Sequence, residues 1–289
     1  AEESGGAIFV LRSSSVLLEN MAIHRNRATY GAGYFLEEVM AVLLKNAFSG
    51  NAAKKHGGAL SAISNPSMKL TDLQLNDNNA SFGGGCYFQE TSVEFSNCTF
   101  TRNHAEGAGG AINGMMSSTL NGDHLRFAEN SALLGGGMYT MQSRMNLNDA
   151  HFEKNKAGLD GGAIVATSES IALGTSLIFS NNKAANGGAI RAGFRTTIEL
   201  EDSSFVDNTA DETGGAISAV WSENIKITNA EILGNSAGDG GGAHFSQVLN
   251  STLINVAITK NTAKTGGGLY LKPESKTHIS QCRFVKNMA

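Results

Sequence analysis

The chain has 289 residues, of which 35 are Gly and 2 are Pro, and its formal net charge is -4. This charge, with only 17% charged residues, argues against a nucleic-acid binder or a polybasic membrane binder, both of which must neutralise phosphates. The 41% hydrophobic content argues against disorder, and no apolar run approaches the roughly 18 residues of a membrane-spanning helix. Three cysteines are too few for a disulfide framework or a zinc site, so we expect no metal and no cofactor.

An internal repeat of about 26 residues runs from one end of the chain to the other. Each copy contains an apolar residue, an Asn three positions later, and an Ala two positions after that Asn. Eleven copies without a linker predict a single β-helix domain over residues 1–289, which we expect to be a segment of a longer repeat protein. The Asn column defined in this way comprises Asn26, Asn51, Asn78, Asn103, Asn130, Asn155, Asn182, Asn208, Asn235, Asn261 and Asn287.

Three short strands are predicted in each copy. The first begins at a glycine pair, most clearly in the Gly-Gly-Ala-Ile that starts at Gly5, Gly109, Gly161, Gly187 and Gly214. A second strand ends five positions before the apolar residue, and a third covers Phe-x-x-Asn itself. Apolar and polar residues alternate in these pieces, whereas no stretch has the 3.6-residue period of a helix. Three positions before the apolar residue stands an Asn or Asp in seven of the eleven copies, as a tight turn prefers.

A repeat of this length with three short strands predicts an all-β fold, a parallel β-helix (solenoid) of about 11 coils. Equivalent residues of successive coils would then stack at a spacing of about 4.8 Å. In that arrangement the apolar column fills the core, and the Asn column forms a ladder of side-chain hydrogen bonds inside a turn.

The combination of Gly-Gly-Ala-Ile with Phe-x-x-Asn resembles the repeat of the polymorphic outer membrane proteins of chlamydiae, and the resemblance covers the whole chain. It implies a right-handed parallel β-helix that is displayed outside a cell, often as an adhesin passenger. We therefore expect a non-catalytic structural or adhesive scaffold, secreted or on the cell surface, as part of an appendage, a coat or an adhesin.

A carbohydrate-active enzyme, either a polysaccharide lyase or a glycoside hydrolase, is the alternative interpretation. Enzymes with this fold place carboxylates and basic residues in one column of neighbouring coils, and the candidates here are Asp72, His124, Asp149 and Asp202. A carboxylate pair in such a column could carry out acid–base chemistry or hold Ca²⁺. We favour turn residues over catalytic ones, because the same column is Asn or Asp in copies far from this cluster.

The connection that follows the glycine-pair strand is expected to form a ridge that binds a partner. From the second Gly of the pair to the apolar residue the spacing varies between 15 and 17 residues. Insertions in repeat proteins often map to the binding face. The ridge also carries Met115, Met116, Phe194, Trp221 and Leu249, which are the candidate contacts for a partner surface protein or for the sugar rings of a glycan.

Two further expectations concern modification and assembly. Asn79, Asn97 and Asn250 begin N-glycosylation sequons, which matter only in a eukaryotic secretory pathway. Neither end shows a polar or helical cap, and an uncapped coil offers unpaired strand edges. We therefore expect end-on contact with further β-helix coils or with another protein chain, and no membrane insertion by this segment.

Overall fold

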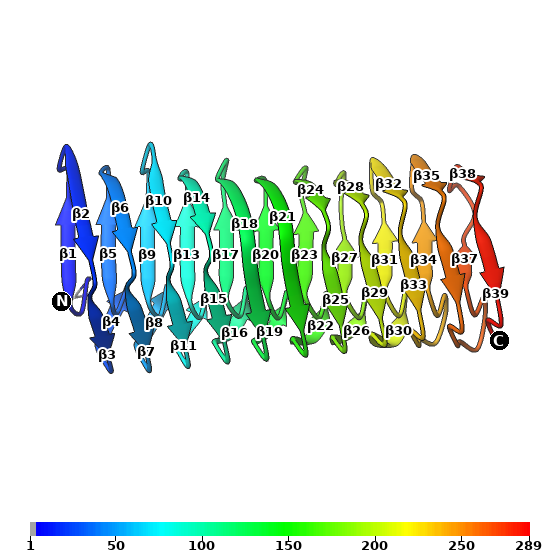
Figure 1. The fold of residues 1–289 in the computed structure, drawn as a ribbon, viewed down its shortest axis with the longest axis horizontal. Helices are drawn as coiled ribbons and strands as arrows, with labels where there is room; N and C mark the ends of the chain where they lie inside the picture. Colours follow the sequence, from blue (N-terminus) through cyan, green and yellow to red (C-terminus); the bar gives the residue numbers. More distant parts are fainter. Residues whose placement is uncertain (1–3) are drawn as a thin grey trace.

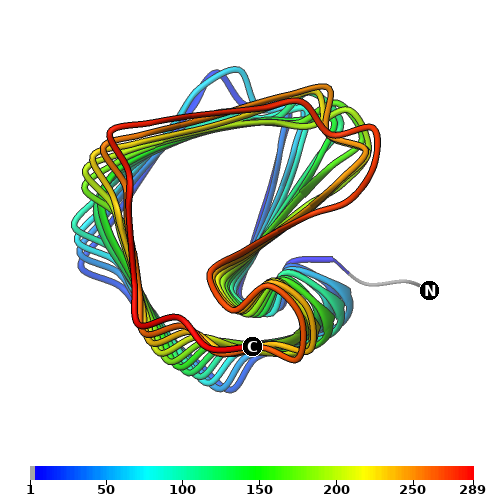
Figure 2. The ribbon, with the colours of Figure 1, turned by 90° about the vertical axis from the view of Figure 1, so that its right-hand side faces the viewer.

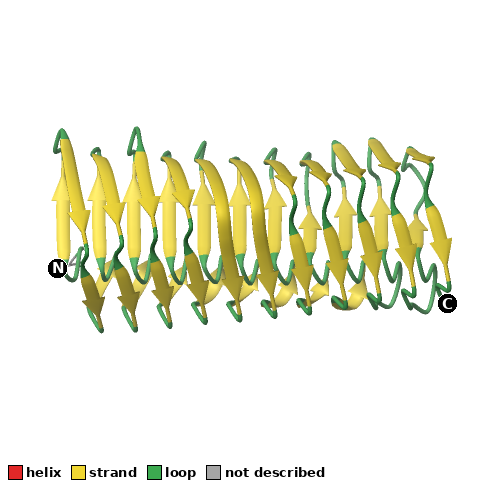
Figure 3. Ribbon diagram, in the orientation of Figure 1, coloured by secondary structure: helices red, strands yellow, loops and turns green. Residues whose placement is uncertain are grey.

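The computed structural model describes residues 4–289, which wind into a rod of eleven coils (Figure 1). The named strands pair in parallel, and each pairing joins equivalent residues of successive coils. The described residues contain only strands, turns and loops (Figure 3), and none of them lies in a helix that could cross a membrane. The predicted parallel β-helix of about eleven coils is confirmed.

The first sheet collects the strand that follows each glycine turn. Along each of its longer strands the first and third residues face the core and the second faces outward. The sheet consists of β1 (Ile8–Leu11), β5 (Tyr34–Glu37), β9 (Leu60–Ile63), β13 (Cys86–Gln89), β17 (Ile112–Met115), β20 (Met138–Met141), β23 (Ile164–Thr167), β27 (Ile190–Ala192), β31 (Ile217–Val220), β34 (Ala243–Ser246) and β37 (Leu269–Leu271).

The second sheet contains the next two strands of every coil, which are separated by a bend at a residue with positive φ. The bend leaves β18 and β21 uninterrupted. Before the bend lie β2 (Ser15–Glu19), β6 (Met40–Leu44), β10 (Met68–Thr71), β14 (Ser92–Ser96), β18 (Thr119–Ala128), β21 (Arg144–Glu153), β24 (Ile171–Thr175), β28 (Thr197–Glu201), β32 (Asn224–Thr228), β35 (Asn250–Ile254) and β38 (Thr277–Ser280). After it lie β3 (Ala22–His24), β7 (Ala47–Ser49), β11 (Gln74–Asn76), β15 (Thr99–Thr101), β25 (Ile178–Ser180), β29 (Ser204–Val206), β33 (Glu231–Leu233), β36 (Ala257–Thr259) and β39 (Arg283–Val285).

The third sheet follows the Asn column in the first eight coils, so the prediction of three strands per coil is incomplete. These strands alternate between five and four residues from β8 onward, and the pairing shifts register between them. The resulting bulges obscure the period-two pattern that would have marked a strand in the sequence. The sheet consists of β4 (Arg27–Tyr30), β8 (Ala52–His56), β12 (Asn79–Phe82), β16 (His104–Ala108), β19 (Ser131–Leu134), β22 (Lys156–Asp160), β26 (Lys183–Asn186) and β30 (Thr209–Thr213).

Stacked phenylalanine rings fill the middle of the core. The rings of Phe100, Phe127, Phe152, Phe179 and Phe205 are fully buried, and neighbouring centroids lie 4.8, 4.5, 5.0 and 4.8 Å apart. The planes of neighbouring rings are within 11° of parallel. Burying each such ring contributes about 1.5–3 kcal/mol, so this column is a main source of stability.

The Asn column forms a continuous hydrogen-bond ladder from Asn26 to Asn287. At Asn130 the side-chain amide donates to Asn155 Oδ1 and to the carbonyl oxygen of Phe100, each at 3.0 Å. Asn130 Oδ1 in turn accepts hydrogen bonds from the backbone N–H and the side-chain amide of Asn103, at 2.9 and 3.1 Å. The buried amide is therefore satisfied only because its neighbours are also Asn.

The glycine turn lies one residue earlier than the sequence pattern suggested in five of the eleven coils. In the fourth coil the left-handed residue is Gly83, with a φ of 63°, and it corresponds to Gly57 and Gly109. Any two residues of a Gly-Gly-Gly triplet resemble the expected pair, and only the backbone conformation distinguishes them. With this correction, the length variation is divided between the ridge and the strand after the Asn column. The variation in spacing that the sequence places on the ridge is therefore only partly there.

Candidate functional site

A concave groove runs along the rod where the first and third sheets meet. Seen end-on, the outline of the coil is indented there, and the glycine turn lies at the bottom of the indentation (Figure 2). Two columns of side chains line the groove, one from each sheet. We call the column on the first sheet the floor column; it comprises Phe9, Phe35, Ser61, Tyr87, Asn113, Tyr139, Val165, Arg191, Ser218, His244 and Tyr270. We call the facing column, in which each residue precedes a glycine turn, the wall column; it comprises Ser4, Tyr30, His56, Phe82, Ala108, Leu134, Asp160, Asn186, Thr213, Asp239 and Thr265.

The N-terminal half of the groove is aromatic. The rings of Phe9 and Phe35 stack with their centroids 5.4 Å apart, and the ring of His56 stacks on Tyr87 at 4.2 Å. Burial, helped by the neighbouring charge of Lys55, lowers the pKa of His56, so this imidazole is neutral at pH 7. This half of the groove therefore offers apolar ring faces and few charges.

The C-terminal half of the groove is polar. Asn186 Nδ2 donates to Asp160 Oδ1 at 3.2 Å, and Thr213 Oγ1 donates to Asn186 Oδ1 at 2.8 Å. Arg191 Nε lies 3.7 Å from Asp160 Oδ1, and burial lowers the pKa of this guanidinium. The wall here is a network of hydrogen bonds, whereas in the N-terminal half it is a row of rings.

Two cavities open along the groove and share Leu134 and Tyr139. The first, of about 410 Å³, includes Tyr87, Asn113 and Met115 in its lining. The second, of about 300 Å³, is lined by the residues of the polar half and by exposed ridge aromatics: Val165, Arg191, Phe194 and Trp221. The two cavities therefore adjoin along the groove.

Several floor-column side chains are buried without a hydrogen-bond partner among residues 4–289. They are Ser61 Oγ, Asn113 Oδ1 and both ring nitrogens of His244. A buried polar atom without a partner costs about 1–3 kcal/mol, so each such atom in a native structure calls for an explanation. For His244 one consequence is clear: burial lowers its pKa to about 4, because the charged imidazolium cannot be solvated there.

The structure brings only some of the ridge candidates together. Phe194 and Trp221 are 53% and 58% exposed and line the second cavity, and Met115 lines the first. Met116 and Leu249 are also exposed, but neither contributes to these two cavities. The ridge is therefore one rim of the groove over part of its length.

The acidic column lies in the bend of the second sheet, and its four candidates all have positive φ. The φ values are 54° for Asp72, 52° for His124, 47° for Asp149 and 49° for Asp202. The remaining members of this column have the same left-handed conformation, whether they are Asn, Ser, Lys or Gln. Asn and Asp tolerate this conformation better than most residues, which explains why they dominate the column.

Only one contact joins the candidates of this column to each other. His124 Nε2 lies 3.3 Å from Asp149 Oδ2, while His124 Nδ1 lies 2.8 Å from Asp123 Oδ2. Asp72 is three coils and Asp202 two coils from Asp149, about 14 and 10 Å at the strand spacing. The four residues therefore do not converge on one point.

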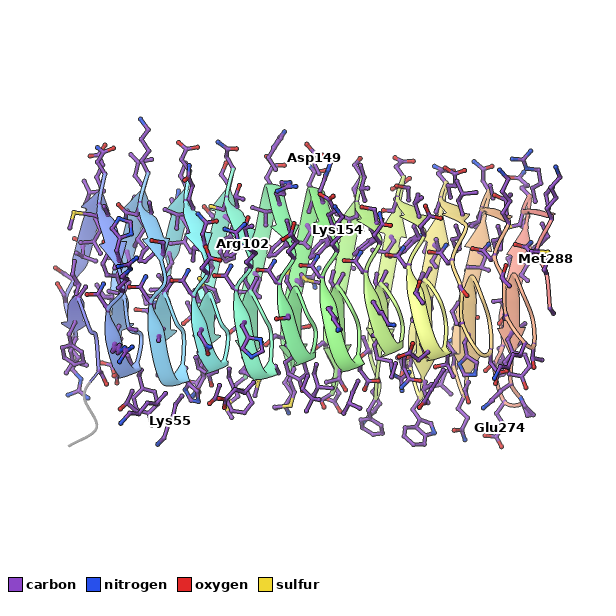
Figure 4. All side chains as sticks on the ribbon, turned by 90° about the horizontal axis from the view of Figure 1, so that it is seen from below. Lys55, Arg102, Asp149, Lys154, Glu274 and Met288 are labelled. Carbon is purple, nitrogen blue, oxygen red and sulfur yellow. The ribbon has the colours of Figure 1, made fainter. Side chains whose placement is uncertain are left out.

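The electrostatics of this cluster are those of an exposed ion pair. The hydrogen bond to Asp123 raises the pKa of His124, and hydrogen bonds from Asn148 and then His124 lower the pKa of Asp123. The His124 side chain is 62% exposed, so solvent screens both effects. Asp149 lies on the opposite side of the rod from Lys55, which adjoins the groove (Figure 4). Among residues 4–289, no group of three or more His, Cys, Asp or Glu side chains could hold a metal ion.

The remaining candidates, the sequon residues and the cysteines, do not line either cavity of the groove. The sequon residues Asn79, Asn97 and Asn250 are exposed. The thiols of Cys86 and Cys98 are free and buried, and burial raises the pKa of both.

The sequence reasoning missed the groove, although one signal for it was present. The residue four positions after the left-handed glycine of each turn is the floor-column residue, and it changes at almost every coil, for example from Tyr87 to Asn113 to Tyr139. Variation at a regular position of a uniform repeat marks an outward-facing surface. That this surface is concave follows from the path of the turn and not from the local pattern.

The chain was compared with known proteins at the level of families, curated proteins and solved structures. A family model described as a right-handed β-helix region matches residues 6–184 and 140–289. Comparisons with curated proteins and with solved structures found no match.

Proposed function

The chain belongs to the right-handed β-helix family, and we propose that it is a non-catalytic scaffold with which a cell surface adheres to a partner. The observation that carries this proposal is the concave groove, where ring faces and buried unpartnered polar atoms lie side by side. A surface of this kind is suited to recognition, because it combines apolar area with a few fixed polar groups.

The acidic column gives less support to an enzyme. Catalytic carboxylates usually owe their activity to burial or to a close like charge, which shift their pKa by several units. His124 and Asp149 instead lie in exposed left-handed turns, and the other two candidates are coils away. A lyase or hydrolase remains the alternative that the experiment below addresses.

The proposed location outside the cell rests on the resemblance of Gly-Gly-Ala-Ile and Phe-x-x-Asn to the repeats of chlamydial polymorphic outer membrane proteins. A rod with a groove along its length would project such a surface away from an anchor. The end-on contact with further coils or with another chain stays a prediction.

Adhesion and turnover can be measured on the same protein. Microspheres coated with the chain are tested for retention on immobilised glycans and matrix proteins, and soluble protein is incubated with polygalacturonate and alginate. We expect retention on at least one surface, no new reducing ends, and no change in retention for Asp149→Ala.

The matched control for Asp149→Ala is Asn229→Ala, which alters the same left-handed column in a coil outside the candidate cluster. Cleavage of an acidic polysaccharide that is lost in Asp149→Ala and kept in Asn229→Ala, with both variants folded, would favour the enzyme. If no surface retains the coated microspheres, the chain is a spacer without a ligand.

A further inference from the structure

The eighth coil departs from its neighbours on the outward face of the first sheet. Arg191, the second residue of β27, is the only floor-column residue that is charged at pH 7, since the low pKa of His244 keeps that imidazole neutral. Gly193 follows directly after β27, at the position that Thr167 and Val220 occupy in the adjacent coils. A Cβ at Gly193 would come within 2.5 Å of Thr167 Oγ1, so the glycine makes room for this hydroxyl group. All of these residues except His244 line the second cavity.

The polar atoms of this cavity are reachable from solvent and are not satisfied by the described residues. Arg191 Nη1 donates to Ser218 Oγ at 3.2 Å, whereas Nε and Nη2 make no hydrogen bond. Arg191 Nε lies 3.7 Å from Asp160 Oδ1, which is too long for a hydrogen bond. The side chains of Arg191 and Asp160 are 18% and 31% exposed, and none of the free atoms, Thr167 Oγ1 included, is sealed from solvent.

Two exposed rings form the ridge side of the same cavity. Phe194 and Trp221 each have more than half of their side-chain surface in solvent, so both offer a free ring face. Trp221 follows Ser218, the floor-column residue of its own coil, by three residues, which is about 10 Å at the rise of a strand. A ligand that reaches both Arg191 and Trp221 is therefore longer than one sugar ring.

The charges around the cavity compensate each other. Asp160 faces Arg191, and on the ridge Arg195 Nη1 lies 3.1 Å from Glu169 Oε1. An anionic ligand at Arg191 would therefore meet the carboxylate of Asp160. A hydroxyl group both donates and accepts hydrogen bonds, so two neighbouring hydroxyls can accept from the guanidinium and donate to the carboxylate. The pair favours an uncharged, hydroxyl-rich ligand.

The position of the cavity on the sheet disfavours an extended peptide. β27 pairs with β23 on one side and with β31 on the other, so no strand edge is open to an added strand. A saccharide needs no such edge, because it is held by its hydroxyl groups and by its apolar C–H faces, which pack on aromatic rings.

We propose that the second cavity binds two adjacent units of an uncharged oligosaccharide, with hydroxyl groups of one unit bridging Arg191 and Asp160 and the ring of the next unit stacked on Trp221. Thr167 Oγ1 provides a further hydrogen-bonding group between these two contacts. This inference rests on the proposed adhesive function and gives it a ligand class.

Titration calorimetry with the folded chain tests the inference. The uncharged probes are cellohexaose, laminarihexaose and mannohexaose, and hexagalacturonate is the anionic probe. Because Trp221 is the only tryptophan and lines the cavity, its fluorescence reports whether a bound probe reaches the ridge. We expect an uncharged probe to bind with one-to-one stoichiometry, to change the tryptophan emission, and to keep its affinity in the presence of hexagalacturonate.

Two variants separate the stacking contact from the hydrogen bonds. Trp221→Ala should weaken binding about tenfold, the loss of one stacking contact. Its matched control is Leu249→Ala, which removes an equally exposed ridge side chain that lines neither cavity and should bind as the unaltered chain does.

Asp160→Asn keeps the shape of the side chain and the acceptor for Asn186, and should weaken binding about tenfold because a charge-assisted hydrogen bond is lost. Asp239→Asn is the control for this change, since it alters the same wall column outside both cavities. Urea midpoints of all four variants establish that each one folds.

The inference is overturned if none of the uncharged probes binds, or if Trp221→Ala and Asp160→Asn both bind as tightly as their controls. It is also overturned if hexagalacturonate binds and no uncharged probe displaces it. Retention of coated microspheres without any binding of an uncharged probe would leave the adhesive scaffold standing and remove only this ligand class. Cleavage of a probe would remove the non-catalytic scaffold instead.

Discussion

The Asn column and the floor column of the groove follow opposite rules, although both repeat once in every coil. The Asn column carries the same residue in all eleven coils, while the floor column holds aromatic, polar and charged residues in turn. In the ladder, the partner of each amide is the next copy of the same amide. In most coils a floor-column residue packs against its neighbours without a hydrogen bond to them. It can therefore be replaced without leaving a neighbouring polar atom unpartnered.

The comparison teaches where a repeat protein can acquire specificity. A substitution in the ladder leaves unpartnered atoms in two adjacent coils, whereas one in the floor column alters only the shape and polarity of the groove. Uniform columns therefore maintain the fold, and the variable column is available for recognition. Four changes, two in the uniform columns and two at the groove, test this division.

The largest effect is expected from Asn130→Ala. This change removes four hydrogen bonds and leaves the buried backbone N–H of Asn103 without its acceptor. We expect the free energy of unfolding to fall by about 3–5 kcal/mol, measured as a lower urea midpoint. Asn79→Ala, which alters an exposed Asn of β12, should change it by less than about 0.5 kcal/mol. Equal effects of the two variants would show that the ladder is dispensable.

A smaller effect is expected from acid, through His244 in the floor column. Burial, and then the charge of Lys272, lower its pKa from 6.5 to about 4, while Asp239 raises it and Arg191 lowers it further. As the pH falls from 6.5 to 4 the unfolded chain takes up a proton at this site and the folded chain does not, so stability falls. We expect a loss of about 2 kcal/mol over this range, less than the full shift implies because the unfolded chain is already half titrated at pH 6.5 and the folded chain is half titrated at pH 4.

His244→Gln is the control for this pH effect, since it keeps a polar side chain and removes the titration. Urea midpoints measured at pH 7 and pH 4 should fall less in the variant than in the unaltered chain. An equal fall in the urea midpoint for both proteins would mean that His244 is solvated in the folded state.

The sequence was sufficient to predict the coil number and the two uniform columns, and insufficient to predict the groove. The Phe and Asn positions recur at almost constant spacing, so their stacking follows from the strand spacing alone. The glycine turn was misplaced in coils such as the fourth, because Gly83, Gly84 and Gly85 are equivalent in the sequence and differ only in φ. That error hid the groove, since concavity depends on how the turn is folded back against neighbouring coils. The third sheet was missed because its bulges break the period-two pattern of a strand.

A more modest effect is expected from Phe152→Leu in the core. The change removes two ring stacks, at 4.5 Å to Phe127 and 5.0 Å to Phe179, but keeps an apolar side chain of similar volume. Leu75 and Ile232 occupy the same column in other coils, so the fold accommodates the exchange. We expect the free energy of unfolding to fall by about 1 kcal/mol, measured by urea unfolding. A loss above about 3 kcal/mol would show that coil stacking requires aromatic rings at this position.

The smallest effect on stability is expected at Trp221, on the rim of the groove. Its side chain is 58% exposed and its φ is 54°, so the residue gains little from packing and occupies a conformation that favours Gly. Trp221→Ala should change the free energy of unfolding by less than about 0.5 kcal/mol, and Trp221→Gly should leave it equal or slightly higher. Both variants are compared with the unaltered chain by urea unfolding. A loss above about 1.5 kcal/mol in the Ala variant would make Trp221 a packing residue, and the rim would then belong with the uniform columns that maintain the fold.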